Sequence, residues 1–310
     1  MEKGAHRMTT LATPPAPRRP RGPVGGPAST EGPGQADGQG PPCADCIADS
    51  AGGLTFDLAD PGGEGIAHLL LRRRVDEDEV RLPLTPTGDG RLRAALPSTV
   101  ELAEGRWDAY AELYGAEPER LVLGVGDLRS LLDRSPSGSL GHVAVRIPYV
   151  TKYGNLTVRS WRRAPHAEAG EIHVGTGTTT VSGRLYGTQL GAGAYAEARY
   201  GADGGAVRRA EATGVGAEFT IALDHPGLAE SARGDWQLWL RPSGESGPEV
   251  RLARLLDDVV DKRQIYTYPA VVCAAADGSA LVGPAFTQDN DLVIRVVSVS
   301  EGAVEQEGKG

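Results

Sequence analysis

The chain has few cysteines and no long apolar run, and each of these shortages excludes a class of protein. Three cysteines in 310 residues do not supply a disulfide framework. No apolar run approaches the roughly 18 residues that a membrane-spanning helix needs. The first residues contain arginine pairs that no apolar core follows, so no secretory or twin-arginine signal is evident. We therefore expect a cytoplasmic protein without a membrane span.

Basic residues are also in short supply. The chain has 32 lysines and arginines against 41 acidic residues, which gives a formal net charge of −9. Because proteins that bind nucleic acid usually carry a basic stripe or patch, we expect no nucleic-acid partner. Nearly all of the positive charge is arginine, since lysine occurs only at positions 3, 152, 262 and 309.

No pattern of catalytic or ligand-binding residues stands out. The sequence has no GxSxG elbow, no GK[ST] phosphate loop and no pair of histidines at metal-ligand spacing. Cys43 and Cys46 form a CxxC without a second pair, and we interpret them as plain thiols rather than as a metal or redox site. Cys273 lies in an apolar run and reads as a small core residue. We expect no metal, no cofactor and no catalytic residue, and leave open whether the protein is an enzyme.

The two ends of the chain differ in composition from the rest. Residues 1–50 are rich in proline, glycine and alanine and contain almost no large apolar side chains. Such a segment cannot bury enough surface to offset its conformational entropy, so we predict a disordered N-terminal arm. Residues 301–310 have the same character and are predicted to form a disordered tail.

Between these ends, sequence blocks recur in the same order. GRWDAYAEL at 105–113 matches GDWQLWLRP at 234–242. YVTKYGNLTVRS at 149–160 matches AFTQDNDLVIRV at 285–296. A repeat of this length is a domain rather than a solenoid unit. We therefore predict two copies of one fold.

Local patterns within the repeat predict β-strands. Short segments with apolar residues at every second position alternate with turns rich in glycine and proline. Seven or so short strands per copy, with little helix, are typical of an immunoglobulin-like sandwich. The predicted fold class is all-β, with two tandem antiparallel immunoglobulin-like β-sandwich domains, at 51–165 and 170–300, after the disordered arm.

Matching positions of the two copies predict the cores. Each copy has a tryptophan just after a glycine turn, and each ends in a strand of the form Leu-x-Val/Ile-Arg. Large aromatic and β-branched residues at alternate positions fill sandwich cores. The predicted core residues are Trp107, Leu156 and Val158 in the first copy and Trp236, Leu292 and Ile294 in the second.

The same alternation places other matching residues on the opposite face. We predict that Tyr110, Arg159 and Trp161 of the first copy, and Trp239 and Arg295 of the second, face outward. An aromatic ring and a guanidinium on one face suit a sugar, whose apolar side stacks while its hydroxyls or phosphate accept hydrogen bonds. The alternative is that these aromatics pack under a loop or against the other domain, with the arginines stacked on them.

The blocks GRWDAYAEL, YVTKYGNLTVRSWRRAPHAEAGEI and LLDDVVDKRQIYTYP carry a family resemblance. They resemble the all-β accessory regions of actinobacterial glycosyltransferases and glycerophosphotransferases of teichoic-acid-type glycopolymer synthesis. The resemblance covers about residues 51–300, and it implies a region that binds or organises polymer beside a catalytic domain. The chain departs from a full enzyme because it has no nucleotide-sugar-binding α/β domain, so the resemblance assigns no catalytic residue.

Three functions follow as hypotheses. The first is a non-catalytic binding or accessory protein for a glycan, a cell-wall glycopolymer or a glycosyltransferase partner. The second is a transferase, glycosyl or glycerophospho in type, with a site between the two domains near residues 162–173. The third is an assembly protein without a small-molecule ligand, which pairs through exposed sheet edges.

Overall fold

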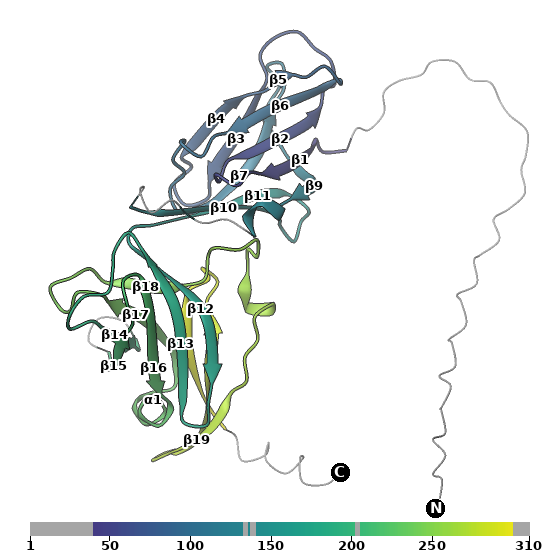
Figure 1. Cartoon of the computed structure of the whole chain (residues 1–310). Coiled ribbons are helices and arrows are strands. Elements are labelled where there is room, and N and C mark those ends of the chain that lie inside the picture. Colours follow the sequence, from purple (N-terminus) through teal and green to yellow (C-terminus); the bar gives the residue numbers. More distant parts are fainter. Residues whose placement is uncertain (1–39, 133–135, 137–140, 202–204, 300–310) are drawn as a thin grey trace, which may run out of the picture. The chain divides into compact units, whose positions relative to one another are not determined.

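The computed structural model describes residues 40–132, 136, 141–201 and 205–299, and this part of the chain is mostly β-strand, as predicted (Figure 1). Most of the predicted arm and the predicted tail lie outside the described residues. Among those described there is one α-helix, α1 (His225–Ser231), which Asp224 caps by accepting a hydrogen bond from the Gly227 N–H. No helix of the described chain is long and apolar enough to cross a membrane.

Strands β1 to β11 form the first lobe, which is built from two sheets. One sheet has the strand order β5-β6-β2-β1-β9, and the other has the order β10-β11-β7-β3-β4 with β8 paired to β7. The 3₁₀ turn η1 (Arg129–Leu131) follows β9. The strands are β1 (Cys43–Ala48), β2 (Leu54–Ala59), β3 (His68–Arg73), β4 (Glu79–Pro83), β5 (Thr85–Pro86), β6 (Arg91–Leu96), β7 (Gly105–Glu112), β8 (Glu119–Arg120), β9 (Val122–Asp127), β10 (Val143–Val150) and β11 (Leu156–Arg163).

Strand β1 corrects the predicted N-terminal arm, because it lies within the range 1–50. It pairs antiparallel with β2 and parallel with β9. Ala44, Cys46 and Ala48 alternate along it and are all buried. The prediction was wrong here because these inward residues are small and follow a proline- and glycine-rich tract. Burial also raises the pKa of the Cys46 thiol, which keeps it in the unreactive protonated form.

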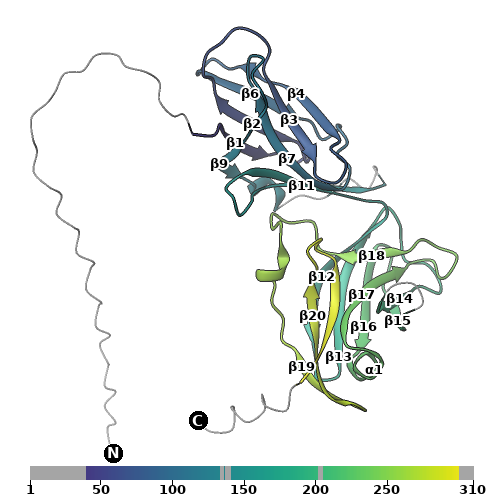
Figure 2. The ribbon, with the colours of Figure 1, turned by 180° about the vertical axis from the view of Figure 1, so that it is seen from behind.

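Strands β12 to β21 form the second lobe, in which seven strands close into a ring. The order β14-β15-β16-β13-β12-β18-β17 returns to β14, and β21, β20 and β19 extend the sheet from β17 (Figure 2). The 3₁₀ turn η3 (Lys262–Gln264) lies between β18 and β19. The strands are β12 (His166–Val174), β13 (Thr178–Tyr186), β14 (Tyr195–Arg199), β15 (Val207–Thr213), β16 (Glu218–Asp224), β17 (Gly234–Arg241), β18 (Val250–Ala253), β19 (Val271–Ala275), β20 (Gly278–Phe286) and β21 (Leu292–Ser298).

The strand pairings of the two lobes correspond. Val158 pairs with Trp107 across β11 and β7, just as Ile294 pairs with Trp236 across β21 and β17. Both lobes also contain one parallel pair, β1 with β9 and β12 with β18. The sequence blocks that match are therefore equivalent in register as well as in order.

The lobes differ in how their sheets are joined. In the second lobe, β15 pairs with β14 and then with β16, and β18 pairs with β17 and with β12. The corresponding segments of the first lobe are interrupted, with Leu84 between β4 and β5 and Leu121 between β8 and β9. The same strands thus give a closed sheet in one lobe and two separate sheets in the other.

The six residues predicted for the core are all buried, at 2% exposure or less. The indole N–H of Trp107 donates to the Ala103 carbonyl at 3.0 Å, and that of Trp236 donates to the Ala232 carbonyl at 3.3 Å. Each tryptophan therefore meets the carbonyl four residues before it, which satisfies its only polar atom inside the core.

The repeated phrase forms the same hairpin turn twice. The Thr151 hydroxyl accepts from the backbone N–H of Asn155 at 3.2 Å, and the Thr287 hydroxyl accepts from that of Asp291 at 3.2 Å. The next-to-last turn residue has a positive φ in both, +85° at Gly154 and +62° at Asn290, where glycine and asparagine are favoured. The repeated sequence thus specifies two equivalent turns, one between β10 and β11 and one between β20 and β21.

Candidate functional site

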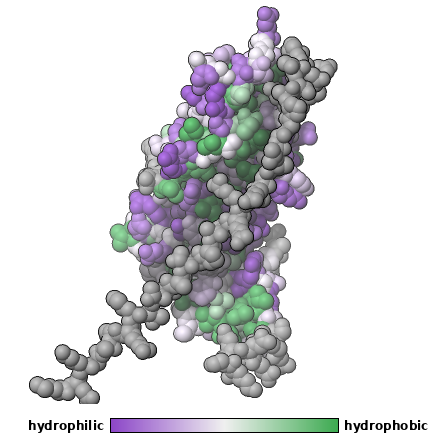
Figure 3. Space-filling model, turned by 90° about the vertical axis from the view of Figure 1, so that its right-hand side faces the viewer, coloured by the Kyte–Doolittle hydropathy of each residue, from purple (hydrophilic) through white to green (hydrophobic). Residues whose placement is uncertain are grey.

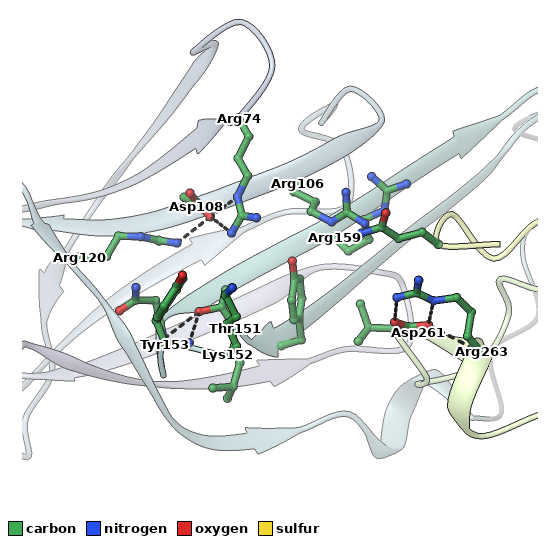
Figure 4. A pocket seen from close by; sticks show the side chains of 15 residues that line it. Arg74, Arg106, Asp108, Arg120, Thr151, Lys152, Tyr153, Arg159, Asp261 and Arg263 are labelled. Carbon is green, nitrogen blue, oxygen red and sulfur yellow. Dashed lines mark hydrogen bonds and ion pairs between the residues drawn. The ribbon is translucent and has the colours of Figure 1, made fainter.

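A cleft of about 690 Å³ lies where the β10–β11 turn of the first lobe meets the segment around η3 (Figure 4). Strand β7 contributes Arg106 and Asp108, and strand β11 contributes Arg159. The remaining lining comes from strand ends and loops of both lobes. The lining residues are Arg74, Arg106, Asp108, Arg120, Tyr149, Val150, Thr151, Lys152, Tyr153, Asn155, Arg159, Val260, Asp261, Arg263 and Gln288.

The cleft is strongly cationic although the chain as a whole is acidic. Its lining carries six cations against two carboxylates. Low-dielectric walls lined by one sign of charge concentrate the field and attract ions of the opposite sign. The six cations are Arg74, Arg106, Arg120, Lys152, Arg159 and Arg263.

Both carboxylates in the cleft are engaged by arginine. Asp108 accepts from Arg74 at 2.8 Å and lies 2.6 Å from Arg120, and its hydrogen bond raises the pKa of Arg74. Asp261 is paired with Arg263, whose hydrogen bond holds the pKa of Asp261 below its usual range. Both acids therefore serve to orient arginines at the cleft.

Arg263 is held at the cleft by the packing of its neighbour Lys262. The Lys262 ammonium is fully buried and donates to Asp257 Oδ1 and to the Val259 carbonyl, both at 2.7 Å. Burial lowers the pKa of Lys262, and the Asp257 carboxylate opposes that shift. This buried pair fixes the η3 segment and so presents Asp261 and Arg263 to the cleft.

One of the cleft cations already holds a carboxylate from the second lobe. Arg159 Nη2 donates to Asp289 Oδ1 at 2.8 Å, and Arg106 lies 4.0 Å from the same oxygen. The Trp161 indole N–H donates to the Asp289 carbonyl at 3.1 Å. Burial lowers the pKa of Arg159, and Asp289 opposes that shift; an arginine keeps its charge at neutral pH in either case. The geometry is that of an arginine site for an oxyanion.

An exposed aromatic residue completes the cleft. Tyr153, in the β10–β11 turn, is 76% exposed, and the Lys152 ammonium lies 4.8 Å from the centre of its ring. The corresponding positions of the β20–β21 turn are Gln288 and Asp289. The same turn thus presents a cation and an aromatic ring in the first lobe, and an amide and a carboxylate in the second.

The predicted stacking aromatics have arginines beside them on both sides. Tyr110 lies under Arg72 at 5.0 Å and Arg120 at 4.9 Å, which come from the strands that flank it. Trp239 lies in the same way between Arg199 at 5.0 Å and Arg251 at 4.5 Å. A sugar ring would have to displace these guanidinium groups. Both sites therefore fit the alternative stated above, in which arginines stack on the aromatic rings.

The other predicted contact residues divide between the lobes. Trp161 is fully buried and Arg159 is 6% exposed, so the prediction that they lie on an open face was wrong. The reason is that the Asp289 turn covers them. Arg295 is exposed and paired with Asp235 at 2.7 Å. The cleft therefore includes Arg159, but neither Trp239 nor Arg295.

The sequence patterns missed most of the cleft. Arg74 and Arg120 lie at the ends of short strands, where neither alternation nor a motif marks them. One signal was present: the two turn phrases differ at the tips, where Lys152 and Tyr153 replace Gln288 and Asp289. In a chain with only four lysines, the solvent-exposed Lys152 distinguishes the first turn from the second.

Neither the metal-ligating side chains of the described residues nor the comparisons with known proteins identify an activity. No group of three or more metal-ligating side chains in the described chain is arranged to hold a metal ion. No protein-family model matches the chain, and no curated protein sequence does.

Several solved structures show a distant likeness. A fragment of Staphylococcus aureus TarS is 15% identical, with 59% of this chain and 55% of the fragment covered, at a TM-score of 0.27. A longer S. aureus TarS structure is 16% identical, and the chain spans 35% of it at the same TM-score. The Plexin A4 extracellular region is 10% identical, with 84% and 31% covered, at a TM-score of 0.22. Similarities at these low TM-scores do not indicate a function for this chain.

Proposed function

We propose that the protein is a non-catalytic binding protein for a phosphate-bearing glycopolymer, and that the polymer binds in the cationic cleft. The observation that carries the proposal is the six cationic side chains that converge there in a chain of net charge −9. Arginine forks bind phosphate oxygens in pairs, and the exposed Tyr153 ring offers an apolar face for a sugar or polyol.

The contact between Arg159 and Asp289 supports an anionic ligand in particular. It places an oxyanion 2.8 Å from one cleft cation and 4.0 Å from another. A phosphodiester of the polymer would meet the neighbouring cations in the same manner. Because both cleft carboxylates are in ion pairs with arginine, neither is free to act as a general base, which favours binding over a transferase reaction.

We propose further that both lobes derive from one immunoglobulin-like sandwich module. The corresponding registers at Trp107 and Trp236, and the two equal turns, support this reading. On this view the polymer site arose in the first copy only, through changes at its turn and at the strand ends beside it.

The proposal is tested by calorimetric titration with glycerol-phosphate polymer, with dextran as the uncharged control. We expect binding of the phosphate polymer that weakens as salt is added, because salt screens exposed charge, and no binding of dextran. Lys152→Glu should weaken binding by about tenfold or more, since one charge reversal near a phosphate exceeds about 1.4 kcal/mol.

The matched control is Arg184→Ala, which removes an exposed arginine paired with Glu218 in the second lobe, outside the cleft lining. It should bind as the unmodified protein does. Equal affinities for Lys152→Glu and the unmodified protein would remove the cleft from the function.

A further inference from the structure

Strand β19 (Val271–Ala275) ends the ten-stranded arrangement of the second lobe. It pairs with β20 on one side, and on the other side no strand among the described residues pairs with it. Its sequence, VVCAA, contains neither a charge nor a proline. Natural sheets usually protect their edges with charged residues, prolines or bulges, so an apolar edge of this kind is suited to pairing with another strand.

An apolar row runs inward from this edge. Val272 pairs with Leu281, and Leu281 pairs with Val297, so the three side chains share one face of β19, β20 and β21. They are 61%, 36% and 48% exposed. Figure 3 shows hydrophobic side chains gathered at the lower end of the described chain, the end where Figure 1 places β19. The row and the edge form one surface, which we call the β19 surface.

The corresponding row of the first lobe is covered. Val145 and Trp161 pair across β10 and β11 at the positions of Leu281 and Val297, and they are 2% and 0% exposed. They belong to the same hydrophobic cluster as Ala253 and Leu255 of the second lobe. In this molecule, such a row is thus buried by another β-module of the same chain.

We propose that a second copy of the protein covers the β19 surface, by antiparallel pairing of β19 with the partner's β19. A twofold axis at Cys273 sets Val272 opposite the partner's Ala274, and the reverse, so the strand is self-complementary. Main-chain hydrogen bonds join the two edges, and the apolar row continues from one subunit into the next. None of the β19 surface residues lines the cationic cleft. The dimer and the polymer site are therefore independent proposals, and the failure of one leaves the other unaffected.

The experiment is sedimentation velocity of the full chain, from low to high micromolar concentration. We expect a reversible monomer–dimer equilibrium. Ala274→Lys, which places a charge at the centre of the paired edge, should raise the dimer dissociation constant by about tenfold or more, because it buries an unpaired ammonium. Val272→Lys should act in the same direction.

Val215→Lys is the matched control, since Val215 is 86% exposed and lies before β16, outside the β19 surface. It should dimerise as the unmodified protein does, and circular dichroism should show that all three variants are folded. An unmodified chain that stays monomeric throughout would overturn the proposal, and so would Lys variants that dimerise as tightly as the control.

Discussion

The β10–β11 hairpin of the first lobe and the β20–β21 hairpin of the second have the same register and the same turn, but opposite surroundings. The outer face of the first, with Arg159 and Trp161, is buried by the second lobe. The outer face of the second, with Arg295 and Val297, is open to solvent. Equivalent backbone positions thus serve as an interior contact in one copy and as a surface in the other.

The tips of the two turns also differ in their contacts. The Gln288–Asp289 tip is engaged, since Asp289 holds Arg159 and Trp161. The Lys152–Tyr153 tip lines the cleft, and within the described residues it makes no corresponding contact with the second lobe. The difference shows that one module can carry two roles, because the few residues at a turn tip decide what the turn contacts.

The largest expected effect comes from truncating the buried member of the outer-face pair. Trp161→Ala should lower the free energy of unfolding by about 3–5 kcal/mol, because it removes a fully buried indole. Val297→Ala, at the corresponding exposed position, should cost about 1 kcal/mol or less. Urea denaturation followed by circular dichroism measures both. Equal losses would mean that the two faces are buried alike.

The paired arginines provide a second contrast. Arg159→Met removes the partner of Asp289 and the cation over the Trp161 ring, and should cost about 1–3 kcal/mol. Arg295→Met breaks an exposed pair with Asp235 and should cost about 0–1 kcal/mol, with a smaller effect in high salt. The same denaturation curves, recorded at low and high salt, compare them. A loss for Arg295→Met as large as that for Arg159→Met would contradict the assignment.

The smallest effect concerns a feature of the second lobe, the helix α1 that follows β16. Its buried His225 bonds Thr179 Oγ1 through Nε2 at 2.7 Å, while Nδ1 has no partner among the described residues. Burial lowers the pKa of His225 in the folded state. The unfolded chain therefore binds this proton first, and the His225 contribution to stability, complete above about pH 6.5, is lost as the pH falls through the folded-state pKa.

We expect the free energy of unfolding to fall by about 1 kcal/mol more in the unmodified protein than in His225→Gln, between about pH 7.5 and about pH 5. Urea curves at the two pH values measure this difference. A variant that keeps the full pH dependence would assign it to other groups.

Much of the fold was predictable because its signals are local. Alternation along LTVRS and LVIRV indicated two strands. It also indicated that Leu156, Val158, Leu292 and Ile294 are buried. The matching tryptophans indicated two equivalent lobes, and the registers at Trp107 and Trp236 correspond. Strand β1 was not predicted, because its inward alanine and cysteine residues give only a weak hydrophobic alternation with their neighbours.

The candidate site was much less predictable. Arg159, which lines the cleft, was among the predicted contact residues, but its arginine neighbours were not, since they come from strand ends and loops far apart in the chain. Arg106 and Arg263, for example, are separated by more than half of the sequence. The open or buried state of a strand face was equally hidden, because alternation distinguishes the two faces of a strand without saying what covers each.

The sequence by itself determined the β-rich class, the inward side chains and the doubled turn, because period-two alternation and turn chemistry act between residues close in the chain. Only the tertiary structure decided that the Asp289 turn buries Trp161, that six cations meet at one cleft, and that β19 is left as an edge. These features depend on which distant segments come together, and that is settled by the packing of whole lobes.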